Sequence, residues 1–202
     1  MANTMNMSME KVTQVETKRS EAMIKGSLFA GMKVRLPFLI LALAGGLLAA
    51  GVIDAFEEVL EEIFIVAVFI PVIMDMGGSV GTQSSTAFAR GLALGHIDMS
   101  VFKKHLGREL VVGVVMGAIV GAVTGVLAYI WQGEAGLGLA VGLSLLITMT
   151  VASFLGFLVP YVLFKLKMDQ AAGSDPIITT IKDITGLLVY FVLVSTFLSS
   201  LM

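Results

Sequence analysis

Residues Leu110–Trp131, LVVGVVMGAIVGAVTGVLAYIW, form an apolar stretch of 22 residues that contains no charged side chain. As an α-helix, such a stretch is about 33 Å long and can cross the ~30 Å hydrocarbon core of a bilayer. Glycine recurs at every fourth position, at Gly113, Gly117, Gly121 and Gly125. Small residues at this spacing lie on one face of a helix and allow a second helix to approach closely in lipid. The stretch therefore predicts a membrane-spanning helix that packs through its glycine face.

The composition of the whole chain is also that of a membrane protein. Hydrophobic residues make up 57% of the 202 residues and charged residues only 14%, and the mean hydropathy is +0.96. Soluble domains have about 25% charged residues. A net charge of −2 does not favour nucleic acid as a partner. The chain has no cysteine and two histidines, which argues against disulfides, thiolate nucleophiles and sulfur- or histidine-rich metal sites.

Four further segments have the length and apolar character of transmembrane helices. The five predicted spans are Leu36–Ile53, Ile63–Ala89, Leu110–Trp131, Leu137–Phe164 and Pro176–Leu198. The sequence thus predicts an all-α integral membrane bundle of five transmembrane helices over residues 36–202. A polar cytoplasmic leader over residues 1–35 precedes it, with a short surface helix around Lys11–Lys25. The first apolar run begins too late for a secretory signal peptide.

Lysine and arginine are distributed unevenly among the segments that connect the spans. Twelve of the thirteen lie in residues 1–35, 90–108 and 165–175, and none lies in residues 54–62 or 132–136. Because positive residues favour the cytoplasmic side, we expect a multi-pass protein of the cell membrane with a cytoplasmic N-terminus and an external C-terminus. The outer connection Asp54–Glu62, DAFEEVLEE, places its apolar residues at helical spacing. It predicts a short amphipathic helix on the membrane surface.

Three ionisable residues, Asp75, Lys182 and Asp183, lie inside the predicted spans. An ionisable group in lipid is costly and marks a candidate functional site. The helical rise places Asp75 about 18 Å from the outer face and Asp183 about 10 Å from the cytoplasmic face. In a ~30 Å core, both carboxylates then lie at similar heights. Lys182 points about 100° away from Asp183 around a helix, so we expect it to extend towards the cytoplasmic surface instead of pairing with Asp183.

The sequence around Asp75, PVIMDMGGSVGTQSST, is rich in oxygen ligands. The residues expected to interrupt the helix are Pro71, Gly77, Gly78 and Gly81. An interrupted helix exposes backbone carbonyls, which a membrane tolerates only inside protein or along a cavity. The hydroxyl and amide side chains that follow are Ser79, Thr82, Gln83, Ser84, Ser85 and Thr86. The alternative interpretation is a kinked helix with consequences for packing only, and a phosphate-binding loop is not favoured because the stretch contains no lysine.

Carboxylate, hydroxyl, amide and carbonyl oxygens are ligands for hard cations, and for Mg²⁺ in particular. Mg²⁺ retains several waters and typically binds one or two carboxylates. A two-fold dimer with a pore on its axis would supply two copies of Asp183, which is a physical reason to expect a homodimer. Asp169 and Asp175 lie just before the fifth predicted span and are expected at its cytoplasmic mouth. Asp175 is also a predicted N-cap, because Pro176 suits the first helical position.

Two stretches of the chain resemble the membrane domain of the MgtE family of magnesium channels. One is PVIMDMGGSVGTQSSTAFARGLALG, residues 71–95, which is similar to the proline- and glycine-rich pattern of the family's second span. The other is DPIITTIKDITGLLVY, Asp175–Tyr190, which is similar to a family segment with an acid before [VI]-T-G-L-L. The resemblance extends over about residues 30–200, with five spans in the same order.

This resemblance implies a magnesium channel, not an enzyme, that lies in the lipid bilayer as a homodimer with its pore between subunits. The second and fifth spans would line the pore, and Asp183 would bind hydrated Mg²⁺, for which Mn²⁺ or Co²⁺ are surrogates. The candidate metal-site residues are Asp183, Asp75, Gly77, Gly78, Ser79, Thr82, Gln83 and Asp175.

The chain departs from the family's pattern in three respects. Residues 1–35 are too few for the family's cytosolic CBS domains, so no nucleotide site is expected in this chain. Ser79 and Thr82 stand where asparagine is usual, and Asp75 stands where glycine is usual. Asp175 replaces an asparagine and makes the expected cytoplasmic mouth more acidic. The additional acid at Asp75 predicts tighter divalent binding, altered selectivity or a coupling site for Na⁺ or H⁺.

Three other functions fit parts of the sequence. A Na⁺- or H⁺-coupled Mg²⁺ exchanger has the same pore residues. An intramembrane aspartyl protease would use Asp75 and Asp183 as a dyad, although Met74 and Lys182 precede them where such proteases have a glycine-containing motif. A purely structural membrane subunit would leave Asp183 without a role.

Overall fold

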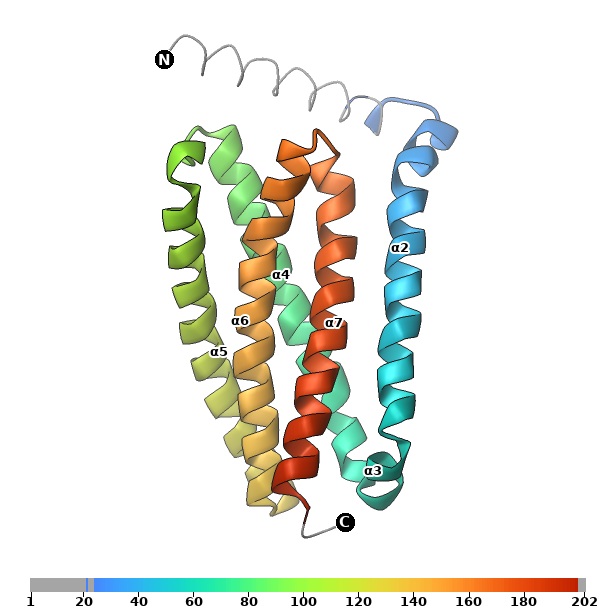
Figure 1. Cartoon of the computed structure of the whole chain (residues 1–202), viewed down its shortest axis with the longest axis vertical. Coiled ribbons are helices and arrows are strands. Elements are labelled where there is room, and N and C mark those ends of the chain that lie inside the picture. Colours follow the sequence, from blue (N-terminus) through green and yellow to red (C-terminus); the bar gives the residue numbers. More distant parts are fainter. Residues whose placement is uncertain (1–20, 22–23, 200–202) are drawn as a thin grey trace.

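The computed structural model describes Glu21 and residues 24–199 (Figure 1). The described elements are α2 (Leu28–Ala55), α3 (Glu57–Glu62), the 3₁₀ helix η1 (Phe64–Phe69), α4 (Ile70–Ala93), the 3₁₀ helix η2 (Met99–Val101), α5 (Phe102–Gln132), α6 (Ala135–Lys165) and α7 (Gln170–Phe197). Five segments of this part are long and apolar enough to cross a membrane, which confirms the predicted five-span all-α bundle. The helix predicted around Lys11–Lys25 lies almost entirely outside the described residues.

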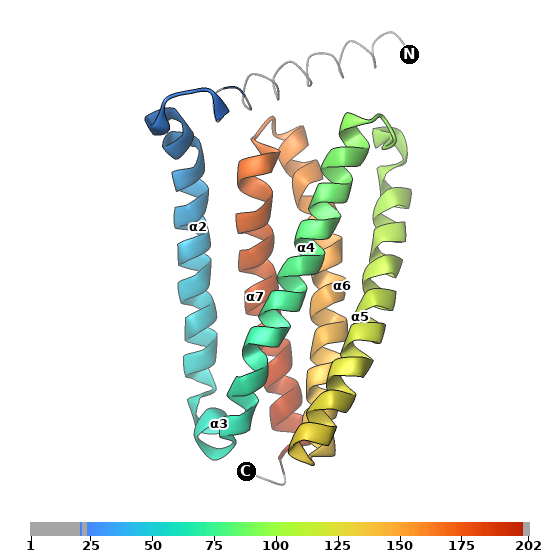
Figure 2. The ribbon, with the colours of Figure 1, turned by 180° about the vertical axis from the view of Figure 1, so that it is seen from behind.

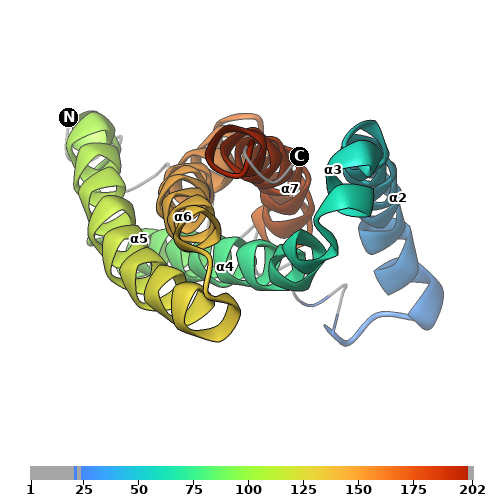
Figure 3. The ribbon, with the colours of Figure 1, turned by 90° about the horizontal axis from the view of Figure 1, so that it is seen from below.

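The long helices form a curved bundle in which α6 has the most buried residues. Seen from below, α6 and α7 lie against α4, while α5 lies beyond α6 and α2 lies at the opposite end of the arc (Figure 3). Seen from behind, helix α4 crosses diagonally in front of α6 and α7 (Figure 2). Sixteen residues of α6 are buried, whereas only Gly45 and Ala49 of α2 are buried. Helix α2 therefore presents most of its apolar side chains outward, as a helix in contact with lipid does.

The predicted glycine face of α5 packs directly against α6. All four glycines of this face are buried. A methyl group on Gly117 would lie 2.8 Å from the Leu146 carbonyl oxygen, and one on Gly138 would lie 2.7 Å from the Gly125 carbonyl oxygen. The two helix backbones are thus so close that a side chain larger than hydrogen would overlap the opposite backbone, which confirms the packing role predicted from the sequence.

Helix α4 is continuous from Ile70 to Ala93, so the predicted interruption at its proline and glycines is wrong. Pro71 lies in the first turn, where its missing N–H has no intrahelical acceptor. The chain changes direction earlier, at Ile63, and η1 leads into α4. The glycines serve close packing: a methyl group on Gly77 would lie 2.8 Å from Thr148 Cγ2 of α6, and one on Gly81 would lie 2.8 Å from Ile178 Cγ2 of α7.

Helix α7 begins at Gln170, six residues before the predicted start at Pro176. The N-cap is Asp169, whose Oδ1 accepts a hydrogen bond of 2.9 Å from the Ala172 backbone N–H. The prediction of Asp175 as the cap is therefore wrong, and Pro176 lies inside the helix. The earlier start adds nearly two turns to α7 and places Asp175 on a helical face instead of at a helix end.

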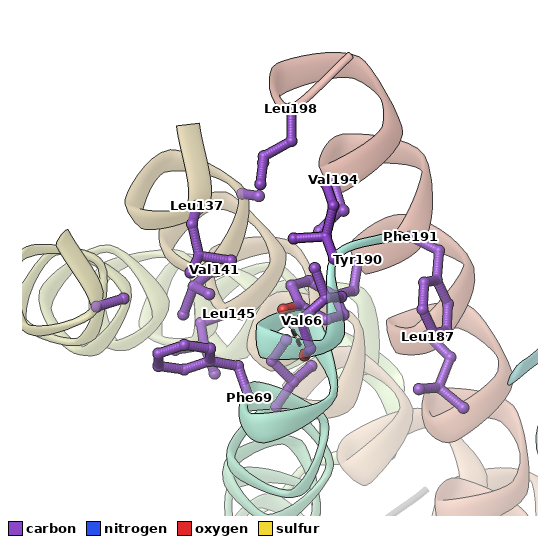
Figure 4. Close-up of a cluster of buried hydrophobic side chains, with 14 of the residues drawn as sticks. Val66, Phe69, Leu137, Val141, Leu145, Leu187, Tyr190, Phe191, Val194 and Leu198 are labelled. Carbon is purple, nitrogen blue, oxygen red and sulfur yellow. Dashed lines mark hydrogen bonds between the residues drawn. The ribbon is translucent and has the colours of Figure 1, made fainter. Parts of the chain in front are cut away.

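A buried hydrophobic cluster joins α6, α7 and η1 near the end of the bundle that carries α3 (Figure 4). Inside it, the Tyr190 hydroxyl donates a hydrogen bond of 2.9 Å to the Val66 carbonyl oxygen. A buried carbonyl without a donor is costly, so this bond stabilises the 3₁₀ turn that positions the start of α4. Helix α3 packs Val59 and Leu60 against the same cluster, which confirms the predicted amphipathic helix.

Candidate cation-binding groove

An open groove with a volume of about 700 Å³ lies between α4 and α7. Its lining residues are Pro71, Met74, Asp75, Gly78, Ser79, Thr82 and Gln83 from α4, and Asp175, Thr179, Lys182 and Asp183 from α7. Of the eight candidate metal-site residues, seven line this groove. Gly77 does not line it, because it faces Thr148 of α6 and the Lys182 side chain. Asp75 and Asp183 line the same groove.

The groove residues are brought together because they share the same helical spacing on both helices. Asp75, Ser79, Thr82 and Gln83 follow one another at steps of four, three and one residues. On α7, the steps from Asp175 through Thr179 and Lys182 to Asp183 are identical. Residues at i, i+4, i+7 and i+8 share one face of an α-helix. The same spacing would have identified Thr179 as a groove residue, but only with a helix that begins before Asp175.

The polar side chains of α4 in this groove face outward from the bundle. Asp75, Ser79, Thr82 and Gln83 are all exposed, as is Asp175 at the start of the α7 face. The Thr82 hydroxyl donates a hydrogen bond of 2.9 Å to Asp175 Oδ1 and so links the two helices across the groove. Exposed carboxylate, hydroxyl and amide groups at this depth of a membrane-spanning bundle need protein or water against them, because lipid cannot solvate them.

Lys182 pairs with Asp183, so the prediction that it extends towards the cytoplasmic surface is wrong. Its side chain is only 4% exposed, and Nζ lies 2.6 Å from Asp183 Oδ1. Nζ also donates a hydrogen bond to the Met74 carbonyl oxygen of α4. Asp183 Oδ1 makes no hydrogen bond of acceptable angle. This contact is therefore a close ion pair without good alignment, as expected for neighbours that point about 100° apart.

Two glycines of α4 provide the space that the lysine occupies. A methyl group on Gly77 would lie 3.2 Å from Lys182 Cδ, and one on Gly78 would lie 3.3 Å from Nζ. The side chain therefore crosses from α7 over the glycine backbone of α4 and reaches the Met74 carbonyl. The sequence alone did not indicate this path, because it depends on how closely the two helices approach at these glycines.

The ionisable residues that line the groove carry a net negative formal charge. Three carboxylates, Asp75, Asp175 and Asp183, and one ammonium, Lys182, sum to −2. Among the described residues, no three histidine, aspartate or glutamate side chains lie close enough to hold one metal ion. A hard cation in this groove would thus retain water in its inner shell and contact the protein partly through that water, which is the binding mode typical of Mg²⁺.

A second polar network, centred on Glu109 of α5, was not predicted from the sequence. Ser84 of α4 donates a hydrogen bond of 2.6 Å to Glu109 Oε1. Ser153 of α6 lies within 3.1 Å of both Glu109 Oε1 and the Glu109 carbonyl oxygen. Glu109 precedes the predicted third span by one residue, and Ser84 was grouped with the hydroxyls around Asp75. In the structure Ser84 is buried away from the groove, so this network joins α4, α5 and α6.

Comparison with known proteins gives a consistent result. The chain is 37% identical over 167 residues to the magnesium transporter MgtE of Bacillus subtilis, covering 83% of this chain and 37% of that protein. It is 37% identical over 164 residues to the magnesium transporter MgtE of Enterococcus faecalis, covering 81% and 36%. For the magnesium transporter MgtE of Thermus thermophilus the identity is 31% over 156 residues, covering 77% and 34%. The chain spans little more than a third of the length of these relatives.

The family model named MgtE, described as divalent cation transporter, matches residues 70–193. This match is more than half of the chain, and it contains all of α4 and most of α7, the two helices that line the groove. On this evidence, the chain belongs to the MgtE family of divalent cation transporters.

Proposed function

We propose that this chain conducts Mg²⁺ across the cell membrane, and that the groove between α4 and α7 forms one wall of the ion path. The observation that carries the proposal is the convergence of three carboxylates with hydroxyl and amide oxygens in one groove of a membrane-spanning bundle. Such a ligand set suits hard cations. The relatives named as magnesium transporters support Mg²⁺ as the ion, with Mn²⁺ and Co²⁺ as surrogates.

A second copy of the chain would complete the pore. The groove is open on the outside of the protomer, and its α4 side chains are exposed at membrane depth. Since lipid cannot satisfy these groups, we propose that a two-fold partner covers the groove and encloses water between the two α4–α7 faces. The pair would place two Asp183 carboxylates along one path, which suits a hydrated divalent cation.

The proposed transport is passive and inward. An interior-negative potential of 100 mV contributes about 4.6 kcal/mol to the entry of each divalent ion. No coupling reaction is needed for that direction. The ion pair between Lys182 and Asp183 supports a conducting role over an aspartyl protease, in which two carboxylates share a proton.

Mg²⁺ uptake into proteoliposomes at a set voltage tests this function. We expect the reconstituted chain to take up Mg²⁺ when a K⁺ diffusion potential makes the interior negative, with identical Na⁺ and pH on both sides. Protein-free liposomes provide the background. Uptake that requires a Na⁺ or H⁺ gradient would replace the passive channel with a coupled exchanger and turn attention to Asp75. Absence of Mg²⁺ uptake under every gradient would contradict the proposed function.

The dimer can be tested by cross-linking because the chain contains no cysteine. Ser79→Cys introduces one thiol on the groove face of α4, and we expect a short bis-maleimide to give covalent dimers in reconstituted membranes. The matched control is Val123→Cys, an exposed position on α5, which is expected to give monomer only. Equal cross-linking at both positions, or at neither, would contradict a dimer built on the α4–α7 face.

A further inference from the structure

Lys182 is a buried cation in contact with the carboxylate that the proposed function assigns to Mg²⁺. Its ammonium lies 2.6 Å from Asp183 Oδ1 and donates to the Met74 carbonyl. Asp183 Oδ1 is itself inaccessible to solvent, whereas the Asp183 side chain as a whole is 12% exposed. The lysine therefore contacts one carboxylate oxygen of Asp183, and an ion in the groove would bind the other oxygen.

The charge of this ammonium reduces the attraction of the groove for cations. Without Lys182, Asp75, Asp175 and Asp183 would give −3 per protomer instead of −2. Conduction requires an ion to bind well enough to enter and weakly enough to leave. A fixed positive charge beside Asp183 helps the ion to leave, because it raises the energy of a bound divalent cation. Asp175 remains available to attract ions to the groove.

We propose that Lys182 sets the affinity of the pore site: it is a tethered counter-charge that weakens the binding of a divalent cation at Asp183 and so allows its release. The inference rests on the proposed function, since it deepens the role of the same groove. Gly77 and Gly78 belong to this arrangement, because they provide the space through which the lysine reaches its position.

Titration of the purified full chain with MgCl2 tests the proposal without requiring transport. Lys182→Gln removes the charge but retains an amide that can donate to the Met74 carbonyl. Its Kd for Mg²⁺ is expected to fall about 10-fold or more, since an opposite charge within about 4–6 Å changes proton binding at a carboxylate by about 10-fold or more, and a divalent cation carries twice the charge of a proton. Lys182→Arg retains the charge and is the matched control, expected near the wild-type Kd. An unchanged or higher Kd for Lys182→Gln would overturn the proposal.

A double-variant cycle on Asp183 separates this effect from a loss of local structure. Asp183→Asn removes the carboxylate that the ammonium is proposed to weaken, so adding Lys182→Gln to Asp183→Asn is expected to change the Kd much less than adding it to the wild type. An equal change in both backgrounds would show that the ammonium does not act on Asp183, and the proposal would fail.

A second variant covers the case in which Lys182→Gln does not give a monodisperse, folded protein. Lys182→Met removes the charge but keeps an unbranched side chain of similar length that suits a buried position. We expect the same direction of change in Kd as for Lys182→Gln, and an unchanged Kd would overturn the proposal. Wild-type protein that binds Mg²⁺ but does not carry it in proteoliposomes would contradict the proposed function only, because the titrations still decide the role of Lys182.

Discussion

Asp183→Asn is expected to reduce voltage-driven Mg²⁺ uptake about tenfold or more. A charged acceptor contributes roughly 1.5–3 kcal/mol to a hydrogen bond with a donor such as metal-bound water, and 1.4 kcal/mol corresponds to one order of magnitude in binding. The substitution leaves two carboxylates and the Lys182 ammonium in the groove, so its net charge changes from −2 to −1 per chain. Initial rates of Mg²⁺ entry into proteoliposomes at a fixed potential measure the effect.

The asparagine variant is preferable to Asp183→Ala, because its amide oxygen can still lie beside the Lys182 ammonium. Alanine would leave that buried cation without its counter-ion and would destabilise the bundle for reasons unrelated to transport. Asp98→Asn is the matched control. Asp98 lies outside the groove and caps η2 by accepting a hydrogen bond from Ser100 N–H, and asparagine caps a helix about as well as aspartate. Equal uptake by wild type and Asp183→Asn would exclude Asp183 from the ion path.

Glu109→Leu is expected to destabilise the bundle by about 1.5 kcal/mol, because two buried hydroxyls lose a charged acceptor but keep neutral ones. Ser84 and Ser153 are 3% and 0% exposed, and both lie within hydrogen-bond distance of Glu109 Oε1. They also lie 3.2 Å from each other, and Ser153 can still donate to the Glu109 backbone carbonyl oxygen, so neither hydroxyl is left without an acceptor. Thermal unfolding of the purified protein in a mild detergent, followed by intrinsic fluorescence or light scattering, gives the shift in midpoint.

Glu109→Gln distinguishes the loss of hydrogen bonds from the loss of charge. Glutamine retains an acceptor oxygen of the same reach, so its unfolding midpoint is expected between those of the wild type and Glu109→Leu. Mg²⁺ uptake per folded protein should be unchanged in Glu109→Gln, because Glu109 does not line the groove. If Glu109→Leu unfolds at the wild-type temperature, the network does not contribute to joining α4, α5 and α6.

Several features were predictable because they depend on local periodicity. The apolar runs indicated five spans, and the four-residue glycine spacing of α5 indicated its packing face. Asp75 and Asp183 were identified from their cost in lipid, and the structure brings them to one groove together with Ser79, Thr82 and Gln83. The boundaries were less accurate. Helix α7 begins at Gln170, because the Asp169 carboxylate caps it there and the helix tolerates Pro176 in its interior.

The sequence by itself determined the membrane location of the spans, the pairing of helices through glycine and the chemistry of the candidate ligands, because hydrophobic periodicity and residue type are properties of short segments. Only the tertiary structure decided where Lys182 points and what Glu109 binds. Both depend on the distance between helices that are far apart in the chain. Two glycines of α4 allow the lysine to reach the Met74 carbonyl, and α4 and α6 bring two serines to one glutamate of α5. Such contacts follow from packing in three dimensions, which local sequence patterns do not specify.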